Sequence, residues 1–364
     1  MYKALYREFR PETFEEVVGQ AHVVRVLRNQ LKSDCVSHAY IFCGTRGTGK
    51  TTMARLLAKG LNCMAGADER PCGECEACHA IREGVFMDVV EIDAASNNSV
   101  DNIRDLRESV KYPPAVGRKK VYIIDEVHML SDSAANALLK TLEETPAHVV
   151  FILATTEPHK LPQTILSRCL RLDFKRIPNH LIIEQMKMIC KSKGVDADDA
   201  ALQVLATAGD GSARDGLSLL EQCLAGGSDR LSEADVLDIL GFVGDGEYLE
   251  MVDFIMESNI EKAIGLLDSL IRDGKEVKQF AAGLLGHYRN LMISKYSDDP
   301  QKFLAMSAEN ALRIKAQADS ISMDIINDAI MEIADTLREI KWSTQARILT
   351  ELCILKLISR AKSV

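Results

Sequence analysis

The chain has 364 residues, which at roughly 150 residues per domain predicts two or three domains. Hydrophobic residues make up 47% of the chain and charged residues 27%, as in ordinary globular proteins. The formal net charge of −9 excludes a uniformly basic coat for nucleic acid. The charge is uneven, because residues 1–60 hold ten Lys and Arg against five Asp and Glu, whereas residues 181–242 hold five against eleven. The net charge therefore does not exclude a localised basic patch that binds nucleic acid.

The first residues, MYKALYREFRP, lack the apolar core of a signal peptide. No run of about 18 uncharged apolar residues occurs that would span a membrane. We therefore expect a cytoplasmic protein with no membrane partner, whose ten cysteines are not joined in disulfides. Six cysteines are scattered and are interpreted as small buried apolar residues, whereas four lie close together in the sequence.

Short apolar runs alternate with helical patterns over the first 175 residues. Runs bounded by polar or turn residues predict strands covered on both faces. The five predicted strands are residues 38–43, 88–93, 121–125, 149–155 and 170–174. The helical patterns between them supply the crossovers of a parallel sheet. The sequence thus predicts an α/β domain with a five-stranded parallel sheet.

The strand pattern stops after Pro178. Residues 179–242 predict three or four short helices, separated by breaks that contain glycine and serine. Residues 243–364 predict helices to the end of the chain, with apolar residues every three to four positions. We expect domain boundaries near residues 178 and 242.

Residues 44–51, GTRGTGKT, match the phosphate-loop pattern GxxxxGK[ST] between a predicted strand and a predicted helix. Its glycines allow a tight turn in which backbone amides face phosphate oxygens, and the helix N-terminus adds its dipole. We expect Lys50 to reach the β- and γ-phosphates and Thr51 to bind Mg²⁺. The expected nucleotide contacts are Gly44, Thr45, Arg46, Gly47, Thr48, Gly49, Lys50, Thr51 and Thr52.

Two carboxylates, Asp125 and Glu126, end the third predicted strand. Beside a phosphate loop, the first carboxylate holds the metal and the second activates the attacking water. We therefore assign Asp125 to Mg²⁺ and Glu126 to catalysis, and we predict hydrolysis of a nucleoside triphosphate. A strand that ends in solvated acids is the plain alternative.

The tetrapeptide DEVH also resembles the box of DExH helicases. Such helicases need a second RecA-like domain, and nothing after Pro178 predicts one. A nucleic-acid translocase or helicase that uses the same ATP site remains the alternative function. A further alternative function is a zinc-bearing scaffold that binds ATP without hydrolysing it, although such a scaffold has no chemical need for Glu126.

Four cysteines follow the phosphate-loop helix: Cys63 and, after eight intervening residues, Cys72, Cys75 and Cys78, which form two successive CxxC steps. Four nearby thiolates suit tetrahedral Zn²⁺, and a closed shell of four cysteines indicates a structural metal. His79 is a possible substitute ligand. An iron–sulfur cluster, unligated thiols and a redox pair are the alternatives.

Two polar residues follow the fourth predicted strand: Thr156 stands at its end, and Arg168 lies twelve residues later in Ser-Arg-Cys. The phosphate loop, DEVH, ATT and SRC elements, with the opening REFRPETFEEVVGQ, resemble the clamp-loader branch of the AAA+ ATPases. The four-cysteine insertion and the segment GSARDGLSLLEQ narrow the resemblance to the gamma/tau family of bacterial DNA polymerase III. It covers essentially the whole chain.

The resemblance implies roles for four further residues. Thr156 corresponds to sensor 1, and Arg168 to an arginine finger that acts on ATP bound by the adjacent subunit. Arg214 corresponds to sensor 2, which contacts the γ-phosphate in cis. Val18 is an adenine-side contact. The plain alternatives are surface salt bridges for the arginines, a strand-end hydroxyl for Thr156 and an ordinary packing residue for Val18.

The resemblance also implies an ATP-driven motor that opens a sliding clamp and loads it onto primed DNA, with hydrolysis releasing the clamp. The implied partners are clamp-loader subunits of the delta and delta-prime type, further copies of this chain, the sliding clamp and primed DNA. The helical C-terminal third corresponds to a collar that holds the subunits together; a self-contained bundle is the other interpretation. Arg104 is a candidate phosphate contact, or a helix-face arginine paired with Asp101 or Glu108.

Overall fold

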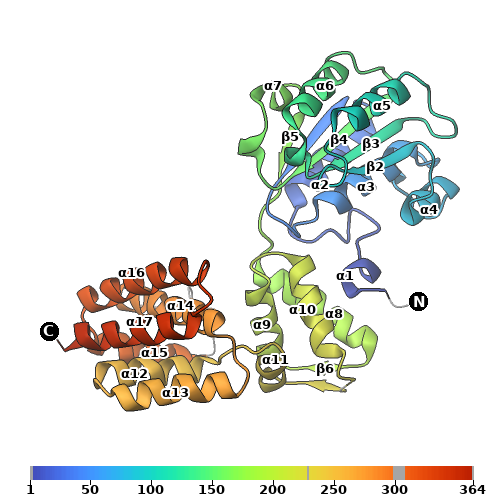
Figure 1. Cartoon of the computed structure of the whole chain (residues 1–364). Coiled ribbons are helices and arrows are strands. Elements are labelled where there is room, and N and C mark those ends of the chain that lie inside the picture. Colours follow the sequence, from blue (N-terminus) through green and yellow to red (C-terminus); the bar gives the residue numbers. More distant parts are fainter. Residues whose placement is uncertain (1–2, 228, 298–307, 363–364) are drawn as a thin grey trace. The chain divides into compact units, whose positions relative to one another are not determined.

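The computed structural model describes residues 3–227, 229–297 and 308–362 (Figure 1). The chain divides into two compact units. The first unit comprises Met1–Ile189 and Ala208–Glu221, and the second comprises Cys190–Thr207 and Gln222–Val364. Among the described helices, none combines the length and the apolar character that crossing a membrane requires.

A five-stranded sheet forms the centre of the first unit. Its order is β2-β3-β4-β1-β5, and every neighbouring pair is parallel. The strands are β1 (Ala39–Cys43), β2 (Val89–Asp93), β3 (Lys120–Asp125), β4 (Val149–Thr155) and β5 (Leu170–Asp173). The five strands predicted from the sequence are therefore confirmed, with ends that differ by at most one residue.

Two apolar layers cover the two faces of this sheet. On β1, Ile41 points into the core that α5 (Val100–Val110) and α6 (Asp132–Glu143) share with the sheet. The neighbouring Tyr40 and Phe42 point into the opposite core, with α2 (Ala21–Ser33) and α3 (Lys50–Asn62), and Figure 1 shows these helix pairs on opposite sides. Because successive strand residues face opposite ways, a run that is apolar throughout needs a cover on both faces.

The remaining elements of the first unit connect the strands or follow the sheet. The cysteine segment lies between α3 and β2 and contains η1 (Ala67–Glu69) and α4 (Glu76–Glu83). Short elements are α1 (Leu5–Glu8), η2 (Val127–Met129), η3 (Pro158–Lys160) and α7 (Gln163–Leu166). Most of α8 (Asn179–Lys193) and most of α10 (Ala213–Leu224) also belong to this unit.

The second unit begins with α9 (Asp199–Ala208), α11 (Glu233–Ile239) and a small parallel pair, β6 (Asp196–Ala197) and β7 (Arg230–Leu231). The structure has four helices in residues 179–242, as the sequence predicted. The prediction that this segment contains only helices was wrong, because it also contains β6 and β7. The pair forms where the Asp196 amide donates to the Asp229 carbonyl at 2.9 Å, and the Asp198 amide to the Leu231 carbonyl at 3.0 Å. Strands of two residues are too short to produce a hydrophobic alternation.

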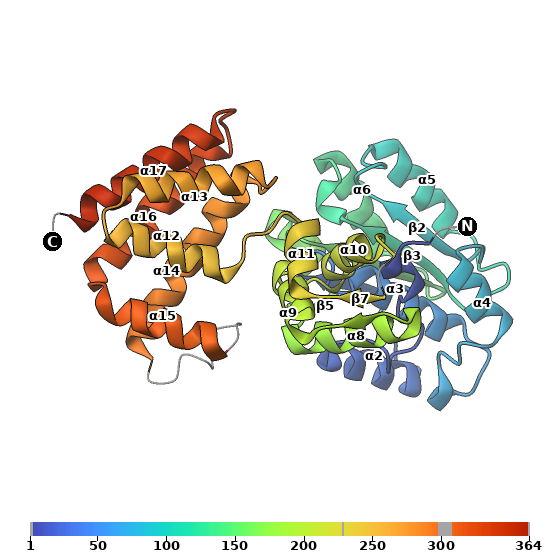
Figure 2. The same ribbon diagram turned by 90° about the horizontal axis from the view of Figure 1, so that it is seen from below.

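In the rest of the second unit, the described residues form six helices, and Figure 2 shows them packed together. Their core contains Phe280, Tyr288, Leu291, Ile314 and Ile354, all at most 1% exposed. The sequence also predicts helix for residues 298–307 and 363–364, which lie outside the part of the chain that the structure describes. The helices are α12 (Asp245–Met256), α13 (Ile260–Arg272), α14 (Val277–Tyr296), α15 (Ala308–Ser320), α16 (Met323–Ile340) and α17 (Ala346–Ala361).

Candidate functional site

A cavity of about 550 Å³ lies in the first unit, at the edge of the sheet where β1 and β3 end. The carboxyl ends of parallel strands meet at one edge, so the loops that follow them share one site. Both predicted motifs contribute to the cavity, which is lined by Arg46–Thr52, Asp125 and Glu126 together with Val18 and Arg214. Gly44 and Thr45 lie at the base of the loop and do not line the cavity.

The phosphate loop is packed against its own backbone and against the start of α10. The Lys50 ammonium donates to the carbonyl oxygens of Gly44 and Thr45, each at 2.9 Å. Burial lowers the pKa of Lys50, while Glu126 and Asp125 oppose this change. Gly47 has a φ of 74°, and a Cβ there would overlap the Ser212 hydroxyl, so only glycine fits.

Asp125 lies within hydrogen-bond distance of the phosphate-loop helix. The Thr51 hydroxyl donates to Asp125 Oδ2 at 2.7 Å, and Asp125 Oδ1 accepts from the Glu126 amide at 3.0 Å. Mg²⁺ prefers oxygen ligands, including hydroxyl and carboxylate oxygens next to phosphate groups. The adjacent oxygens of Thr51 and Asp125 therefore fit the metal that the sequence analysis assigned to them.

Glu126 adopts a left-handed backbone conformation, with a φ of 49°. Its Oε2 atom accepts from the Thr156 hydroxyl at 3.0 Å and from the Thr156 amide at 3.2 Å. His128, whose side chain is 6% exposed, places Nδ1 3.4 Å from the same oxygen. Thr156 does not itself line the cavity, but it contacts the carboxylate that does. Two residues that sequence analysis considered separately thus form one hydrogen-bonded unit.

Arg214 and Val18 both line the cavity. The Arg214 guanidinium carbon lies 4.8 Å from the centre of the Tyr6 ring, a cation–π distance. Tyr6 and Arg10 also line the cavity, and no sequence motif predicted them as site residues. The sequence pointed to these two residues only through their place in the opening segment, because no spacing rule connects them to the phosphate loop.

Arg168 does not line the cavity of its own chain. Its guanidinium pairs with Glu143 at 2.7 Å and donates to the Thr164 carbonyl at 2.9 Å. About 35% of the side chain remains exposed. The structure therefore places this arginine away from its own nucleotide-binding cavity, on an accessible part of the first unit.

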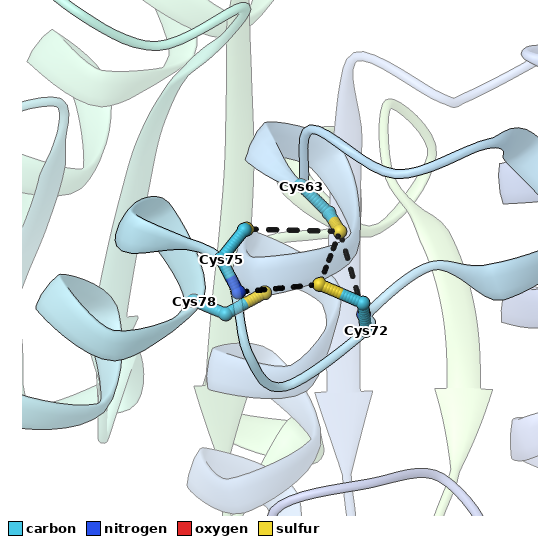
Figure 3. A group of neighbouring side chains, drawn as sticks. All are labelled: Cys63, Cys72, Cys75 and Cys78. Atoms are coloured by element: carbon cyan, nitrogen blue, oxygen red, sulfur yellow. Dashed lines mark hydrogen bonds between the residues drawn. The ribbon is translucent and has the colours of Figure 1, made fainter.

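The four clustered cysteines converge between the end of α3 and α4, as Figure 3 shows. All four sulfurs lie within 4.8 Å of one another, with Cys63 Sγ 3.4 Å from Cys72 Sγ and 4.0 Å from Cys75 Sγ. Four ligands at a Zn–S distance of about 2.3 Å would stand about 3.8 Å apart, so the cluster fits zinc. None of the ten cysteines, all in the described residues, forms a disulfide.

The local environment favours a thiolate at one of these cysteines. Burial opposes ionisation of Cys75, but hydrogen bonds from the Met64 and Cys78 amides outweigh it and lower its pKa to about 6. Burial raises the pKa of the Cys63 and Cys78 thiols. His79 points elsewhere: its Nδ1 atom lies 2.7 Å from an Arg82 nitrogen, and it is not part of the sulfur cluster.

Arg104 lies on the exposed face of α5 and pairs with Asp101 at 3.0 Å. This is the helix-face pair that the sequence analysis gave as the alternative to a phosphate contact. Ser99 caps the same helix by accepting from the Asn102 amide, and Asn97 donates to the Asp93 carbonyl. These polar side chains therefore make local contacts in the described structure.

The fold and the site together define a class. A parallel sheet in the order β2-β3-β4-β1-β5, a phosphate loop after β1 and an Asp-Glu pair after β3 form a nucleotide-binding domain of the AAA+ type. Three protein families match successive parts of the chain. They are the DNA polymerase III delta subunit (residues 19–178), the clamp loader ATPase lid domain (181–229), and domain III of subunits gamma and tau (231–364).

Curated relatives match nearly the whole chain. The DNA polymerase III subunit tau of Bacillus subtilis (strain 168) is 42% identical over 360 residues, 98% of this chain and 63% of the relative. Subunit tau of Escherichia coli (strain K12) is 42% identical over 98% of this chain and 55% of its own length. Subunit gamma of Buchnera aphidicola is 35% identical over 98% of this chain and 99% of its own length. The chain therefore belongs to the gamma/tau family of bacterial DNA polymerase III, and it spans about 55–63% of the two tau relatives.

Proposed function

We propose that this chain is an ATP-hydrolysing motor subunit of a bacterial clamp loader, which acts in DNA replication in the cytoplasm. One observation carries the hydrolytic part: Lys50, Thr51, Asp125 and Glu126 come from distant segments and meet at one cavity that also holds Arg214. Membership of the gamma/tau family supports the clamp-loader part. ATP binding opens the sliding clamp for loading onto primed DNA, and hydrolysis releases it.

In this proposal the phosphate loop binds the triphosphate. Lys50 exchanges its two backbone carbonyl partners for phosphate oxygens, since an ammonium forms stronger hydrogen bonds with a charged acceptor. Thr51 and Asp125 hold Mg²⁺, which supplies neutralisation of phosphate charge when bound. Glu126 accepts a proton from the attacking water. Thr156 orients the Glu126 carboxylate through the two hydrogen bonds described above.

Two arginines and one apolar residue complete the proposed site. Arg214 contacts the γ-phosphate in cis, as sensor 2, and its position at the cavity supports this role. Arg168 acts in trans on the nucleotide of an adjacent subunit; its exclusion from its own cavity and its exposure support that role. Val18 contacts the adenine side, and the first residues of α3, including Thr52, complete the cradle.

We propose three domains: an ATPase domain at residues 1–178, a lid at 179–242 and an oligomerisation collar at 243–364. The family matches, which change near residues 180 and 230, support this division. The partners are delta- and delta-prime-type subunits, further copies of this chain, the sliding clamp and primed DNA. Residues 63–78 bind a structural Zn²⁺, a proposal that rests on the sulfur distances and on the absence of an open ligand position.

A helicase or translocase is less well supported. The described residues after Pro178 contain helices and one pair of two-residue strands, and they form no second RecA-like sheet. The purified chain should therefore fail to separate a DNA duplex in a strand-displacement assay.

The proposed function is tested by reconstitution with delta- and delta-prime-type subunits, a sliding clamp and primed DNA. Wild-type chain should give ATP hydrolysis that primed DNA stimulates, and it should place the clamp on DNA. Glu126→Gln removes the base but keeps a side chain of the same shape, so it should bind ATP and fail to cycle. Unchanged turnover in Glu126→Gln would remove Glu126 as the base, and no clamp loading by the wild type would refute the proposed function.

A further inference from the structure

A second cavity, of about 330 Å³, lies between the N-terminal segment, α3 and α4. It adjoins the nucleotide-binding cavity, because Arg10, Pro11, Thr52 and Arg55 line both. Its lining is strongly basic and contains a single acidic residue, Glu12. The basic lining residues are Lys3, Arg7, Arg10, Arg55, Lys59 and Arg82.

Carboxylates neutralise only part of this charge. Arg55 pairs with Glu91 at 2.6 Å, and Arg82 pairs with Glu12 at 3.0 Å. By contrast, the Lys59 ammonium makes no hydrogen bond or ion pair with any residue that the structure describes, although Lys59 is only 4% exposed. The cavity therefore contains a nearly buried lysine whose ammonium has no direct partner in the described structure, and Glu12 is the one carboxylate in the cavity's described lining.

Arg10, at the boundary between the two cavities, is in a similar position. Within the described part of the chain it too has no hydrogen-bond or ion-pair partner. Burial lowers the pKa of Arg10, and the nearby Arg55 lowers it further. Burial also lowers the pKa of Lys59, and Glu12 only partly opposes it. Burial thus makes the charged form of both groups less favourable than it is in water.

Burying a charge is costly unless the charge is paired, and phosphate is a preferred partner of lysine and arginine. We propose that this second cavity binds a small, multiply charged phosphate anion such as pyrophosphate, beside the nucleotide site and separate from it. Arg82 lies on α4, four residues after Cys78 on the same helix, so the anion contacts the helix that carries one of the four clustered cysteines. The binding site thereby joins α3 of the ATPase sheet to the zinc-fitting segment.

The size and charge of the cavity favour a small anion over a nucleic-acid strand. A volume of about 330 Å³ is at the small end of the range for ligand pockets. A nucleic-acid backbone carries one negative charge per phosphate along an extended strand. Pyrophosphate instead brings several charges to one point, which matches the concentration of cationic groups around Lys59.

The test uses the 364-residue chain with its phosphate loop filled. The protein is saturated with Mg²⁺ and a non-hydrolysable ATP analogue, and pyrophosphate is titrated in by calorimetry, with the heat of mixing pyrophosphate into the same Mg²⁺ buffer subtracted. Lys59→Met removes the buried charge and keeps an apolar stem of similar length. Lys32→Met is the matched control, because Lys32 lies on α2, is half exposed and lines neither cavity.

We expect one pyrophosphate to bind per chain in the wild type and in Lys32→Met, and at least about tenfold more weakly in Lys59→Met. Affinity for the ATP analogue should stay the same in all three proteins. If Lys59→Met fails to fold, Arg82→Gln, which changes a partly exposed side chain, should weaken pyrophosphate binding instead. No binding once the phosphate loop is filled, or equal affinity in Lys59→Met, would overturn the proposal.

Two further titrations identify the source of the anion. ADP, added after the first site is filled, should bind with the same dependence on Lys59 if the phosphates of a nucleotide enter the cavity; binding of pyrophosphate alone indicates a free anion. A single-stranded oligonucleotide that binds through Lys59, where pyrophosphate does not, would overturn the proposal in favour of nucleic acid. Because ATP hydrolysis is measured separately, failure of this site is distinguishable from failure of the proposed function.

Discussion

The Thr156 hydroxyl donates a hydrogen bond of 3.0 Å to Glu126 Oε2, so the residue at the end of β4 holds the carboxylate that follows β3. The two residues are thirty positions apart in sequence but adjacent in space, because β3 and β4 are neighbouring parallel strands. The contact joins the proposed catalytic base to the proposed sensor. Either residue should therefore affect hydrolysis through the other.

Thr156→Val should lower turnover about 10–100-fold, because the carboxylate loses one of the two donors that orient it. ATP affinity should change little, since Thr156 does not line the cavity. Single-turnover hydrolysis and equilibrium binding of an ATP analogue measure the two effects separately. Thr156→Ser, which retains the hydroxyl, should restore most of the rate. Faster turnover in the valine variant would mean that the hydrogen bond restrains Glu126.

Arg168→Ala should reduce the DNA-stimulated ATPase of the reconstituted clamp loader by about 10³-fold, the usual effect of losing an arginine finger in trans. The slow ATPase of the isolated chain should stay unchanged, because Arg168 does not reach its own cavity. Glu143→Gln is the matched control, since it removes the partner of Arg168 in the described structure and leaves the arginine in place. Full activity in the assembled Arg168→Ala complex would contradict the role in trans.

Removal of zinc should loosen residues 63–78 and spare the nucleotide site. Cys72→Ser should lower the zinc content from about one ion per chain to near zero and lower the melting temperature, whereas affinity for an ATP analogue should change less than about threefold. Zinc should also leave as the pH falls, because thiolate ligands must be deprotonated and protons compete for them. Cysteine variants that keep their zinc and their melting temperature would refute the structural metal.

Asp88 should contribute a stability that acid removes. Its carboxylate accepts hydrogen bonds from the amides of Ala115, Val116 and Gly117 at 2.7–2.8 Å, and Asp88 is 2% exposed. Burial acts to raise the pKa of Asp88, but the three amides outweigh it, so the pKa lies below its ordinary value. A lowered pKa adds stability above the unfolded value of about 3.9, and this stability is lost as the pH falls through the folded value.

Asp88→Ala should therefore lower the free energy of unfolding by about 3 kcal/mol at neutral pH, because three amides lose their acceptor. Asp88→Asn should lower it less and should flatten its dependence on pH below about 4. Urea unfolding of the first unit, measured between about pH 2 and pH 7, checks both outcomes. A steep acid dependence that persists in Asp88→Asn would assign the effect to other carboxylates.

Much of the first unit follows from local pattern. The runs around Ile41, Ile123 and Ile152 are continuously apolar because both faces of the sheet are covered, and this made their strands recognisable. The small β6–β7 pair escaped prediction because its strands have only two residues each. The second cavity also escaped prediction, because its cationic groups are spread from Lys3 to Arg82 and no spacing connects them.

The sequence by itself determined the chemistry that needs residues close along the chain. A phosphate loop requires its glycines, Lys50 and Thr51 in one turn, and the cysteine segment brings its four thiols within sixteen residues. Only the tertiary structure decided which distant groups meet. The parallel order of β3, β4 and β1 placed Glu126 against Thr156 and Asp125 against Thr51, and packing of α10 on the phosphate loop brought Arg214 to the cavity. Folding of the N-terminal segment against α3 and α4 buried the charge of Lys59. Such encounters depend on how separate elements pack, which no local spacing encodes.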